Sequence, residues 1–382
     1  MSVQTLAILV LLGSFFLMIF LRFPIAYAVG LSSVLCLMVQ GSSLSEVCRL
    51  MVKGISSFSL MAVPFFITMG VLMGTGGISE KLIALANACV GWMRGGLAMV
   101  NIVASYFFGG ISGSASADTA SLGSILIPMM VDQGYDDDFS TAVTITSSCE
   151  GLLVPPSHNM VIYATTAGGI SVGALFLAGY LPGALLAASL MIGSYIISVK
   201  RNYPKGEKFN IVNFFKQLSV SIWALAAVII VVVGVVGGMF TATESAAIAV
   251  IYSLIVSVYV YKGLDWKGVW NSLEECVNTL SIVLILIATP ILLPIATQYC
   301  GLDPVQFGII VVLNCGIGLL TPPVGAVLFI GSAVAKLPME KVVKATLPFY
   351  ICMIVTLLLI SFVPDISLLL PKILGGYVPS LT

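Results

Sequence analysis

Apolar runs of about 20 residues, separated by short polar breaks, follow one another along almost the whole chain. A helix needs about that many consecutive apolar residues to span a membrane. The pattern therefore predicts an all-α integral membrane protein that crosses the bilayer many times. The helical spans expected on this basis are residues 5–21, 24–40, 56–73, 82–108, 172–198, 218–239, 245–262, 277–298 and 346–371.

Three further segments interrupt their apolar character with glycine, serine or proline. Residues 109–131 begin Gly-Gly-Ile-Ser-Gly-Ser, and backbone of that kind inside a membrane must be buried in protein or line a wet cavity. We interpret this segment as a re-entrant hairpin with its tip at residues 112–114. Residues 139–167 and 306–335 each contain Pro-Pro and are expected to be broken helices, the first facing the hairpin tip at residues 151–156.

The two broken helices belong to an internal repeat. Gly-Leu-Leu-Val-Pro-Pro at 151–156 matches Gly-Leu-Leu-Thr-Pro-Pro at 318–323, an offset of 167 residues. The pairs Pro128 and Pro294, and Pro182 and Pro348, repeat the offset at 166, and Phe139 and Phe307 repeat it at 168. We expect the two copies to cross the membrane in opposite directions, which is the inverted-topology repeat of many secondary transporters.

The expected organisation is a single domain, residues 1–382, with two copies joined by a linker. Repeat 1 covers about residues 56–198, the linker 199–217 and repeat 2 about 218–371. Lysine and arginine mark the cytoplasmic side of a membrane protein, so the basic linker is expected inside. Its basic residues are Lys200, Arg201, Lys205, Lys208 and Lys216.

Composition agrees with a membrane protein that has little mass outside the bilayer. Hydrophobic residues make up 59% of the 382 residues and charged residues 8%, against about 25% charged in soluble domains. Membrane lipid is therefore the expected surrounding, and a net charge of zero argues against nucleic acid as a partner. None of the eight cysteines forms a C-x-x-C pair, so we expect them to be small core residues. The first apolar run ends at Arg22 without a cleavage site and is taken as a retained span.

The paired Pro-Pro breaks suggest cation chemistry. Each proline removes a backbone donor, so carbonyl oxygens at residues 151–154 and 318–321 lose their helical partners. Carbonyl and hydroxyl oxygens form an uncharged cage that suits Na⁺, a weakly held ion that must be released again. The alternative is a pair of kinked structural helices, but two breaks at corresponding positions of inverted copies favour ion sites.

Three ionisable side chains near the first break carry alternative interpretations. Glu150 is either a functional carboxylate or a protonated, hydrogen-bonded interior group. Asp118 is expected to cap the second hairpin arm rather than to bind an ion. His158, the only histidine, starts a half-helix and with Ser157 and Asn159 would bind a substrate carboxylate, or else would satisfy the unwound backbone.

Two local patterns predict backbone geometry elsewhere. Thr-Ala-Thr-Glu at 241–244 fits a capping box at the start of a helix. Pro64 lies inside an expected span and should kink it.

These motifs make the chain resemble the large membrane subunit of the tripartite ATP-independent periplasmic (TRAP) transporters, within the ion transporter superfamily. The resemblance covers essentially the whole chain. Its most specific segments are Gly-Ile-Ser-Gly-Ser-Ala-Ser-Ala-Asp at 110–118, Val-Pro-Pro-Ser at 154–157, Leu-Phe-Leu-Ala-Gly-Tyr-Leu-Pro-Gly at 175–183, Thr-Ala-Thr-Glu-Ser-Ala-Ala at 241–247 and Leu-Thr-Pro-Pro-Val-Gly at 320–325.

The resemblance implies a non-enzymatic function in the bacterial inner membrane. It implies sodium-driven uptake of a small organic anion that a periplasmic binding protein delivers. It also implies a small membrane partner subunit and an elevator-like motion of the hairpin-bearing core. The sodium-binding residues implied at the hairpin tip and the unwound helices are Ser112, Gly113, Ser114, Gly151, Val154, Gly318 and Thr321.

The substrate leaning rests on one departure from the dicarboxylate-type members. Those members more often have Ile-Pro where this chain has His158 and Asn159, and residues 156–163 look more like members assigned to sialic acid and other sugar acids. We therefore expect an acidic sugar, held by Ser157, His158, Asn159 and Glu150. A C4-dicarboxylate is the alternative substrate. A remote alternative, an intramembrane hydrolase, would have to use His158 as the base for a serine.

The second copy has no hairpin tip to match the first. Residues 282–288 contain no glycine, serine or acidic residue and run directly into Thr-Pro-Ile at 289–291. In the family a hairpin arm and a glycine-rich tip precede such a Thr-Pro-Ile. We predict that Ala288 and Thr289 are not truly adjacent: either residues between them are omitted or the chain carries a deletion, on the order of 40 residues. A chain with such a deletion should fail to transport.

Overall fold

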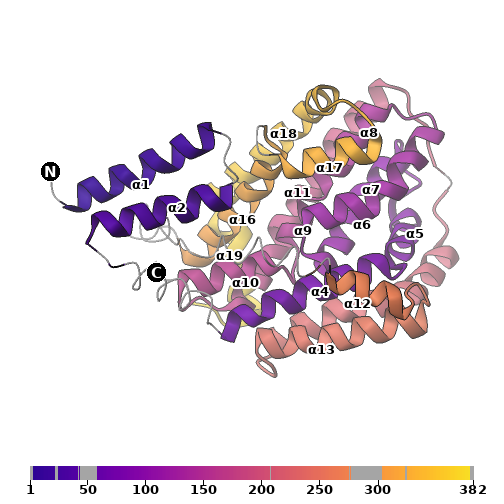
Figure 1. Cartoon of the computed structure of the whole chain (residues 1–382). Coiled ribbons are helices and arrows are strands. Elements are labelled where there is room, and N and C mark those ends of the chain that lie inside the picture. Colours follow the sequence, from indigo (N-terminus) through magenta and orange to yellow (C-terminus); the bar gives the residue numbers. More distant parts are fainter. Residues whose placement is uncertain are drawn as a thin grey trace.

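A computed structural model describes residues 3–21, 25–41, 43, 58–206, 208–274, 276, 303–322 and 325–378, called the described residues below. Helices fill most of them, and no β-strand occurs among them (Figure 1). The expected all-α class is therefore confirmed. The expected span at 277–298 and the junction of Ala288 with Thr289 lie outside the described residues.

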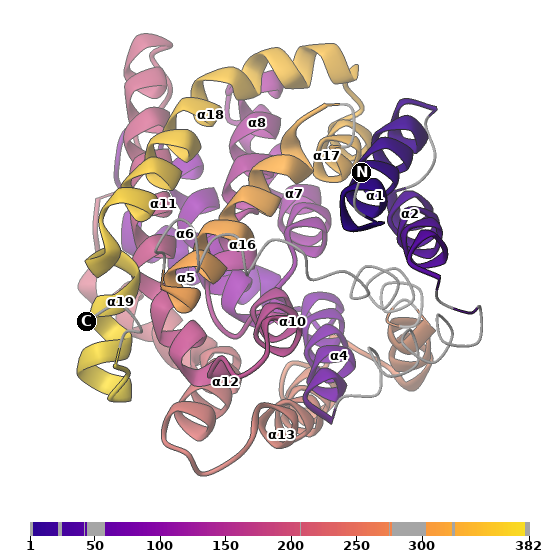
Figure 2. The same ribbon diagram turned by 90° about the vertical axis from the view of Figure 1, so that its left-hand side faces the viewer.

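The N-terminal helices form a pair of their own. Helix α1 (Val3–Phe20) packs along α2 (Ile25–Val39), and both views show the pair beside the main bundle (Figures 1 and 2). Their outer faces are apolar: Phe16 is 63% exposed and Phe20 is 86% exposed. Surfaces of this kind suit lipid. Helices are therefore present at the positions expected, 5–21 and 24–40, as apolar helices.

The third and fourth expected spans needed correction. A 3-10 turn (Phe58–Met61) leads into α4 (Ala62–Thr75), so Pro64 lies in the first helical turn, where it produces no kink. Helix α5 (Ile78–Val90) follows at an angle of 74° to α4. The span expected at 82–108 is wrong because a turn at residues 91–95 separates α5 from the next helix.

A helical hairpin follows, as expected, with longer arms than the sequence indicated. Helix α6 (Gly96–Ser112) is the first arm and α7 (Ala115–Asp132) the second. Between them Gly113 has a φ of 61°, a left-handed conformation that glycine adopts without strain. The predicted tip at residues 112–114 is therefore confirmed, whereas the first arm begins well before residue 109.

Both broken helices are present. The first consists of α8 (Asp137–Ser147), α9 (Glu150–Leu153) and α10 (His158–Ala167), and the second of α16 (Pro304–Leu320) and α17 (Ala326–Ala335). A shift of 167 residues moves residues 137–153 onto 304–320, which are the bounds of α16. The same shift places the start of α11 (Val172–Lys200) on the start of α18 (Met339–Phe362).

The two copies run in opposite directions and touch at equivalent residues. In Figure 1 the chain passes from α8 through α9 to α10 in one direction, and from α16 to α17 in the other. The Cys149 thiol donates a hydrogen bond to the Gly316 carbonyl at 3.3 Å, and the hydroxyls of Ser189 and Thr356 lie 3.0 Å apart. Each pair is 167 residues apart, so a pseudo-two-fold axis passes close to both contacts, as in a symmetric dimer. The inverted repeat is confirmed.

Corresponding aspartates start the two broken helices. Asp136 precedes α8 and Asp303 precedes α16. A tyrosine hydroxyl from further along each copy donates to the aspartate: Tyr203 to Asp136 Oδ2 at 2.6 Å and Tyr377 to Asp303 Oδ1 at 3.2 Å. The same device therefore anchors both helix starts, at opposite ends of the molecule.

The remaining helices surround this core. They are α12 (Ile211–Val236), α13 (Ala242–Ile255) with a π-helical end (Val256–Val260), and α19 (Pro364–Gly375). The span expected at 346–371 divides before Pro364, because proline disfavours helix at the residue in front of it. Thr241 and Glu244 form the expected capping box: the Thr241 amide donates to Glu244 Oε2 at 2.8 Å.

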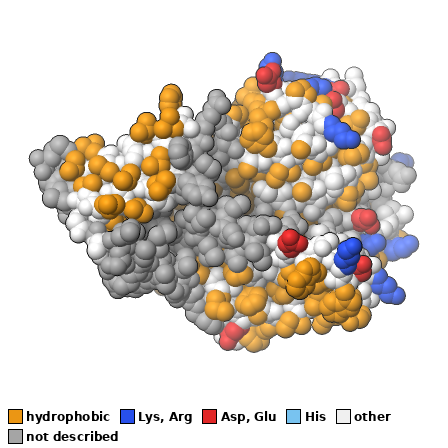
Figure 3. All heavy atoms as spheres, viewed as in Figure 1, with side chains coloured by type: hydrophobic (Ala, Val, Ile, Leu, Met, Phe, Trp, Pro, Cys, Tyr) orange, Lys and Arg blue, Asp and Glu red, His pale blue; other side chains and the backbone are white. Residues whose placement is uncertain are grey.

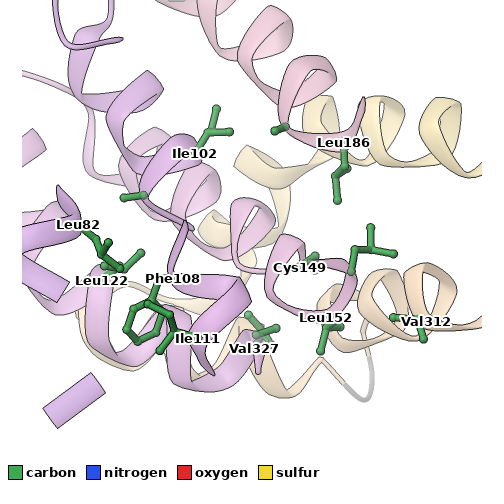
Figure 4. Close-up of a cluster of buried hydrophobic side chains, with 14 of the residues drawn as sticks. Leu82, Ile102, Phe108, Ile111, Leu122, Cys149, Leu152, Leu186, Val312 and Val327 are labelled. Carbon is green, nitrogen blue, oxygen red and sulfur yellow. The ribbon is translucent and has the colours of Figure 1, made fainter. Parts of the chain in front are cut away.

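Buried apolar side chains from both copies share one core (Figure 4). Phe108 and Leu122 from the hairpin meet Leu82 of α5, while Val312 of α16 and Val327 of α17 come from the second copy. Full burial of such a side chain contributes about 1.5–3 kcal/mol. The hairpin is therefore held by both copies rather than by its own arms alone.

Length and apolar composition qualify four described helices as membrane spans, and the bent α4–α5 pair adds a fifth. The four are Val172–Lys200, Ile211–Val236, Ala242–Val260 and Met339–Phe362. Lysine and arginine side chains on the face in Figure 3 gather toward the end of the molecule that carries α5 and α8 (Figures 1 and 3). This asymmetry agrees with the cytoplasmic side assigned to the linker.

An ion cluster closes the cytoplasmic end. Arg201 Nη1 lies 2.6 Å from Asp136 Oδ2 and 3.4 Å from Asp138 Oδ1, and Lys341 Nζ lies 2.7 Å from Asp137 Oδ1. The Tyr203 hydroxyl bond, and after it Arg201, lower the pKa of Asp136. The acidic turn at residues 136–138 therefore ties the first broken helix to the end of α11 and to α18.

We predict that Arg201→Gln lowers the melting temperature of the purified protein at pH 7. Exposed ion pairs contribute about 0.2–1 kcal/mol, so a small shift is expected. Because the pKa of Asp136 is lowered on folding, this contribution is present above its unfolded pKa and is lost as the pH falls through the folded pKa. Scanning fluorimetry from pH 7 to pH 3 should show the difference from wild type shrinking. Lys200→Gln is the matched control, and an equal loss in it would contradict the assignment.

Candidate functional site

The hairpin tip is built from two serines around a left-handed glycine. Ser112 ends α6, and its hydroxyl accepts a hydrogen bond from the Ser114 amide at 3.4 Å. Ser114 is the N-cap of α7, and its hydroxyl accepts from the Ala117 amide at 3.4 Å. The turn therefore gathers two hydroxyls and the start of a helix at one point, with Ser112 buried and Ser114 half-buried.

The tip packs directly on the first broken helix through its glycines. A Cβ placed on Gly109 would lie 2.5 Å from the Gly151 Cα, and one on Gly110 would lie 2.9 Å from the Pro155 carbonyl oxygen. On the opposite side, a Cβ on Gly151 would lie 3.3 Å from the Gly109 Cα. Two stretches of backbone thus approach so closely that no larger residue fits, and the structure brings the predicted tip and break together.

The start of the half-helix α10 completes the arrangement. His158 Nδ1 lies 3.2 Å from the position of a Cβ on Gly113, and the Asn159 side-chain amide donates to the Gly113 carbonyl at 3.3 Å. The same amide lies 3.4 Å from His158 Nε2. Asn159, with His158 beside it, therefore holds the start of α10 against the hairpin tip.

Several polar atoms around the break are buried and have no hydrogen-bond partner among the described residues. A buried polar group normally has a partner, because losing one costs about 1–3 kcal/mol. Five of the twelve such atoms in the described residues lie around this break, which makes it the candidate binding site. These atoms are both carboxylate oxygens of Glu150, Oδ2 of Asp118, the hydroxyl of Ser157 and Nδ1 of His158.

Asp118 differs from its expected role as a helix cap. The N-cap is Ser114, and Asp118 Oδ1 instead accepts a hydrogen bond from the Ser105 hydroxyl of α6 at 3.3 Å. Ser105 lies 3.0 Å from the Ser147 hydroxyl of α8. The Asp118 carboxylate therefore bonds to a serine of the opposite hairpin arm and not to the backbone N–H groups at the start of α7.

A polar ladder beneath the tip was missed in the sequence. The Asn101 amide donates to the Thr144 hydroxyl at 2.6 Å, and the Ser147 hydroxyl donates to Asn101 Oδ1 at 3.4 Å. Asn101 and Ser105 of α6 therefore bond to Thr144 and Ser147 of α8 through buried side chains. Asn101 and Ser105 are four residues apart and Thr144 and Ser147 three, so polar residues at helical spacing were the available signal.

The second break is exposed, although α16, which ends at it, contacts α9 of the first break. Gly318 and Thr321 are exposed among the described residues, and a Cβ on Gly318 would meet nothing within 4 Å. The Thr321 hydroxyl donates to the Ile317 carbonyl of its own helix at 2.7 Å. Of the predicted sodium residues, Ser112, Gly113, Ser114, Gly151 and Val154 therefore come together, while Gly318 and Thr321 do not join them.

The chain matches a known family over most of its length. The family described as "Tripartite ATP-independent periplasmic transporter, DctM component" matches residues 12–290 and 281–366. The family that the sequence motifs indicated is thereby confirmed.

Several relatives are similar over nearly the whole chain. A Salmonella typhimurium protein, "Uncharacterized protein YgiK", is 38% identical over 96% of this chain and 97% of its own. The "Sialic acid TRAP transporter large permease protein SiaM" of Vibrio cholerae is 33% identical over 94% of this chain and 97% of its own. The "C4-dicarboxylate TRAP transporter large permease protein DctM" of Pseudomonas aeruginosa is 34% identical over 83% of this chain and 87% of its own.

A solved structure is similar in fold. The structure entitled "Crystal structure of the Alcanivorax borkumensis YdaH transporter reveals an unusual topology" has a TM-score of 0.52 and 11% identity, with 85% of this chain and 90% of that chain covered. At this identity the similarity concerns the fold alone. It agrees with the helical transporter architecture described above.

The alignments also show that this chain is internally short. The alignment to the Salmonella protein spans 425 positions, whereas the 96% of this chain that it covers is about 367 residues, so about 58 positions have no counterpart here. This number exceeds the roughly 40 residues expected for a missing segment, and a single missing segment stays a prediction. Its position between Ala288 and Thr289 stays a prediction, and it agrees with the two family matches overlapping at 281–290.

We predict different effects for alanine at two glycines, one beside the hairpin tip of the first copy and one at the break of the second copy. Gly109→Ala should destabilise the protein by about 1–3 kcal/mol or more, because its Cβ would overlap the Gly151 backbone. Gly318→Ala should be neutral or stabilising by up to about 1 kcal/mol, because the site is open and helical. Melting temperature and monodispersity in detergent measure both. Equal tolerance of the two changes would contradict the close approach at the tip.

Proposed function

This chain belongs to the DctM family of tripartite ATP-independent periplasmic transporters, and we propose that it is built for sodium-coupled import of an acidic sugar. As a large permease of this family it is a multi-pass protein of the bacterial inner membrane. A tripartite transporter implies a small membrane subunit and a periplasmic binding protein as its partners. The relatives from Vibrio cholerae and Pseudomonas aeruginosa, which match over most of their own length, are named as permeases. Their names argue for transport rather than for a hydrolase.

The observation that carries the proposal is the contact of the hairpin tip with the first break. Pro155 and Pro156 have no N–H, so the carbonyls of Gly151 and Leu152 lack their helical donors. Ser112 and Ser114 carry hydroxyls at the tip, and the Ser114 backbone packs on this segment: its nitrogen lies 3.7 Å from the position of a Cβ on Gly151. Neutral oxygens from two separate elements around one point form a site for Na⁺, which also draws the two elements together.

The substrate residues would lie beside the ion. Ser157 precedes α10 and His158 begins it, so an anionic group there meets the positive end of a helix. The unpartnered Ser157 hydroxyl and His158 Nδ1 supply hydrogen bonds to a carboxylate or to sugar hydroxyls. Glu150 contacts an anionic substrate only when it carries a proton, because two carboxylates repel each other.

The elevator-like motion stays part of the proposal. The pseudo-two-fold axis near Cys149 and Gly316 supports it, because inverted copies can exchange conformations to open a midplane site alternately to the two sides.

The leading alternative is a C4-dicarboxylate. The relatives named for sialic acid and for C4-dicarboxylates are similar to this chain to nearly the same degree, so identity alone favours neither. His158 and Asn159 favour the sugar acid, because an imidazole and an amide together can bond several hydroxyls.

We predict that Na⁺ raises the melting temperature of the purified chain relative to equal K⁺. A ligand that binds only the folded state stabilises it by about 2.7 kcal/mol at 100 times its Kd. Ser114→Ala should shift the sodium titration to several-fold higher concentration. Thr321→Ala is the matched control, because the second break has no facing tip among the described residues. A sodium effect that survives Ser114→Ala unchanged would remove the first site from the proposal.

Uptake into proteoliposomes tests transport, substrate and the short second copy together. We predict no sodium-driven uptake by the chain as it stands, and uptake of sialic acid in preference to succinate once the Salmonella relative's extra segment is inserted between Ala288 and Thr289. Both assays include the small membrane subunit and a loaded periplasmic binding protein.

Uptake by the unmodified chain would refute the predicted transport defect while leaving the transport function standing. Preference of the restored chain for succinate would favour the dicarboxylate alternative. In that chain, His158→Ile combined with Asn159→Pro should move the preference toward succinate without changing the sodium dependence.

A further inference from the structure

A cavity at the cytoplasmic end lies well away from the candidate transport site. Its volume is about 1210 Å³, and its walls come from α5, the first turns of α6, the last turns of α7, the linker and the start of α12. The deepest residue of α6 that lines it, Val100, is 12 residues before Ser112, or about 18 Å along the helix. The cavity therefore opens at the base of the hairpin and not at its tip.

The lining is divided into an apolar and a polar part. Ile83, Val100, Ile125 and Met129 provide aliphatic surface from three helices. The polar part has donors and cations from α5, α7, the linker and α12. These residues are Asn87, Gln133, Lys205, Lys208 and Asn213. An inorganic anion would leave the apolar wall unused, and an apolar ligand would bury the lysines, so the cavity suits an amphipathic anion.

The charge balance of the lining favours an anion. Glu80 is its one acidic residue among those described, against Lys205 and Lys208. Neither lysine ammonium has an ion-pair partner among the described residues. Both are therefore available to a ligand, in contrast to Arg201 and Lys341, which are held by the acidic turn nearby.

The basic wall is fixed in place rather than loose. The Gly95 amide donates to the Pro204 carbonyl at 3.0 Å, and Arg94 forms an isolated β-bridge with Lys205. Arg94 also donates to the Asn202 side-chain oxygen at 2.9 Å. These bonds hold the linker against the α5–α6 turn (Figure 1), so little ordering is needed when a ligand binds.

Exposed aromatic side chains mark the depth of the cavity in the membrane. Trp92 is 43% exposed and Phe209 is 50% exposed, and both belong to the lining. Tryptophan is enriched where a bilayer meets water. Since the linker faces the cytoplasm, the cavity opens at the headgroup level of the inner leaflet, which carries the anionic lipids.

We propose that this cavity binds an anionic glycerophospholipid of the cytoplasmic leaflet, with the headgroup phosphate between Lys205 and Lys208 and an acyl chain along the aliphatic wall. A lipid in this place contacts both hairpin arms at their base together with α5. This inference is independent of which substrate the protein transports.

The test measures the melting temperature of delipidated protein in neutral detergent as lipid is added. Phosphatidylglycerol should stabilise the protein saturably and phosphatidylcholine should do so much less. Lys205→Gln and Lys208→Gln should each weaken the phosphatidylglycerol titration about fivefold. Lys205→Arg should retain it, and Lys216→Gln, on α12 outside the lining, is the matched control.

Three outcomes would overturn the proposal. Equal stabilisation by phosphatidylcholine would remove the anionic requirement. Titrations unchanged in both glutamine variants would place the lipid elsewhere on the protein. Stabilisation by glycerol phosphate alone, with the same dependence on the two lysines, would identify a soluble phosphate ligand instead of a lipid.

Discussion

The close approach of the hairpin tip to the first broken helix is the constraint on which the rest of this structure depends. A helix broken within a membrane leaves polar backbone that lipid cannot satisfy, so protein must cover it. Gly109 and Gly151 permit that cover, because their backbones meet at a distance that excludes a Cβ on Gly109 and leaves little room for one on Gly151. The hydroxyls and the helix start that could hold an ion and an anion are placed by the same contact. Fold and candidate site therefore have one physical origin.

The two copies differ in how well protein covers the polar backbone at their breaks. The first break is buried beneath its hairpin, whereas Gly318 and Thr321 of the second are exposed among the described residues. The relatives carry about 58 aligned positions that this chain lacks, enough for a span together with a hairpin arm. If the unaligned positions lie between Ala288 and Thr289, as predicted, they would supply the cover that the second break lacks among the described residues.

The sequence predicted the features that local chemistry decides. Glycine, serine and proline fix the tip at 112–114 and the breaks after residues 153 and 320, and the 167-residue offset predicted the inverted copies. It failed where distant contacts decide. The turn that divides α5 from α6 is held by the linker, through the bond from Gly95 to Pro204, and no apolar pattern records that bond. The bond of Asp118 to Ser105, which replaced the expected cap of its own helix, also depends on a contact between two different helices.

The symmetry contacts explain why a short second copy is compatible with an intact first site. Cys149 meets Gly316 and Ser189 meets Thr356, so the copies are joined through helices that both of them retain. The first tip is formed by α6 and α7 and packs on the first broken helix, while α17 of the second copy packs along α7. The oxygens proposed to bind an ion therefore all belong to the first copy, although the second copy helps to hold the hairpin that carries them. Transport requires more, because alternating access depends on both inverted copies adopting each other's conformation.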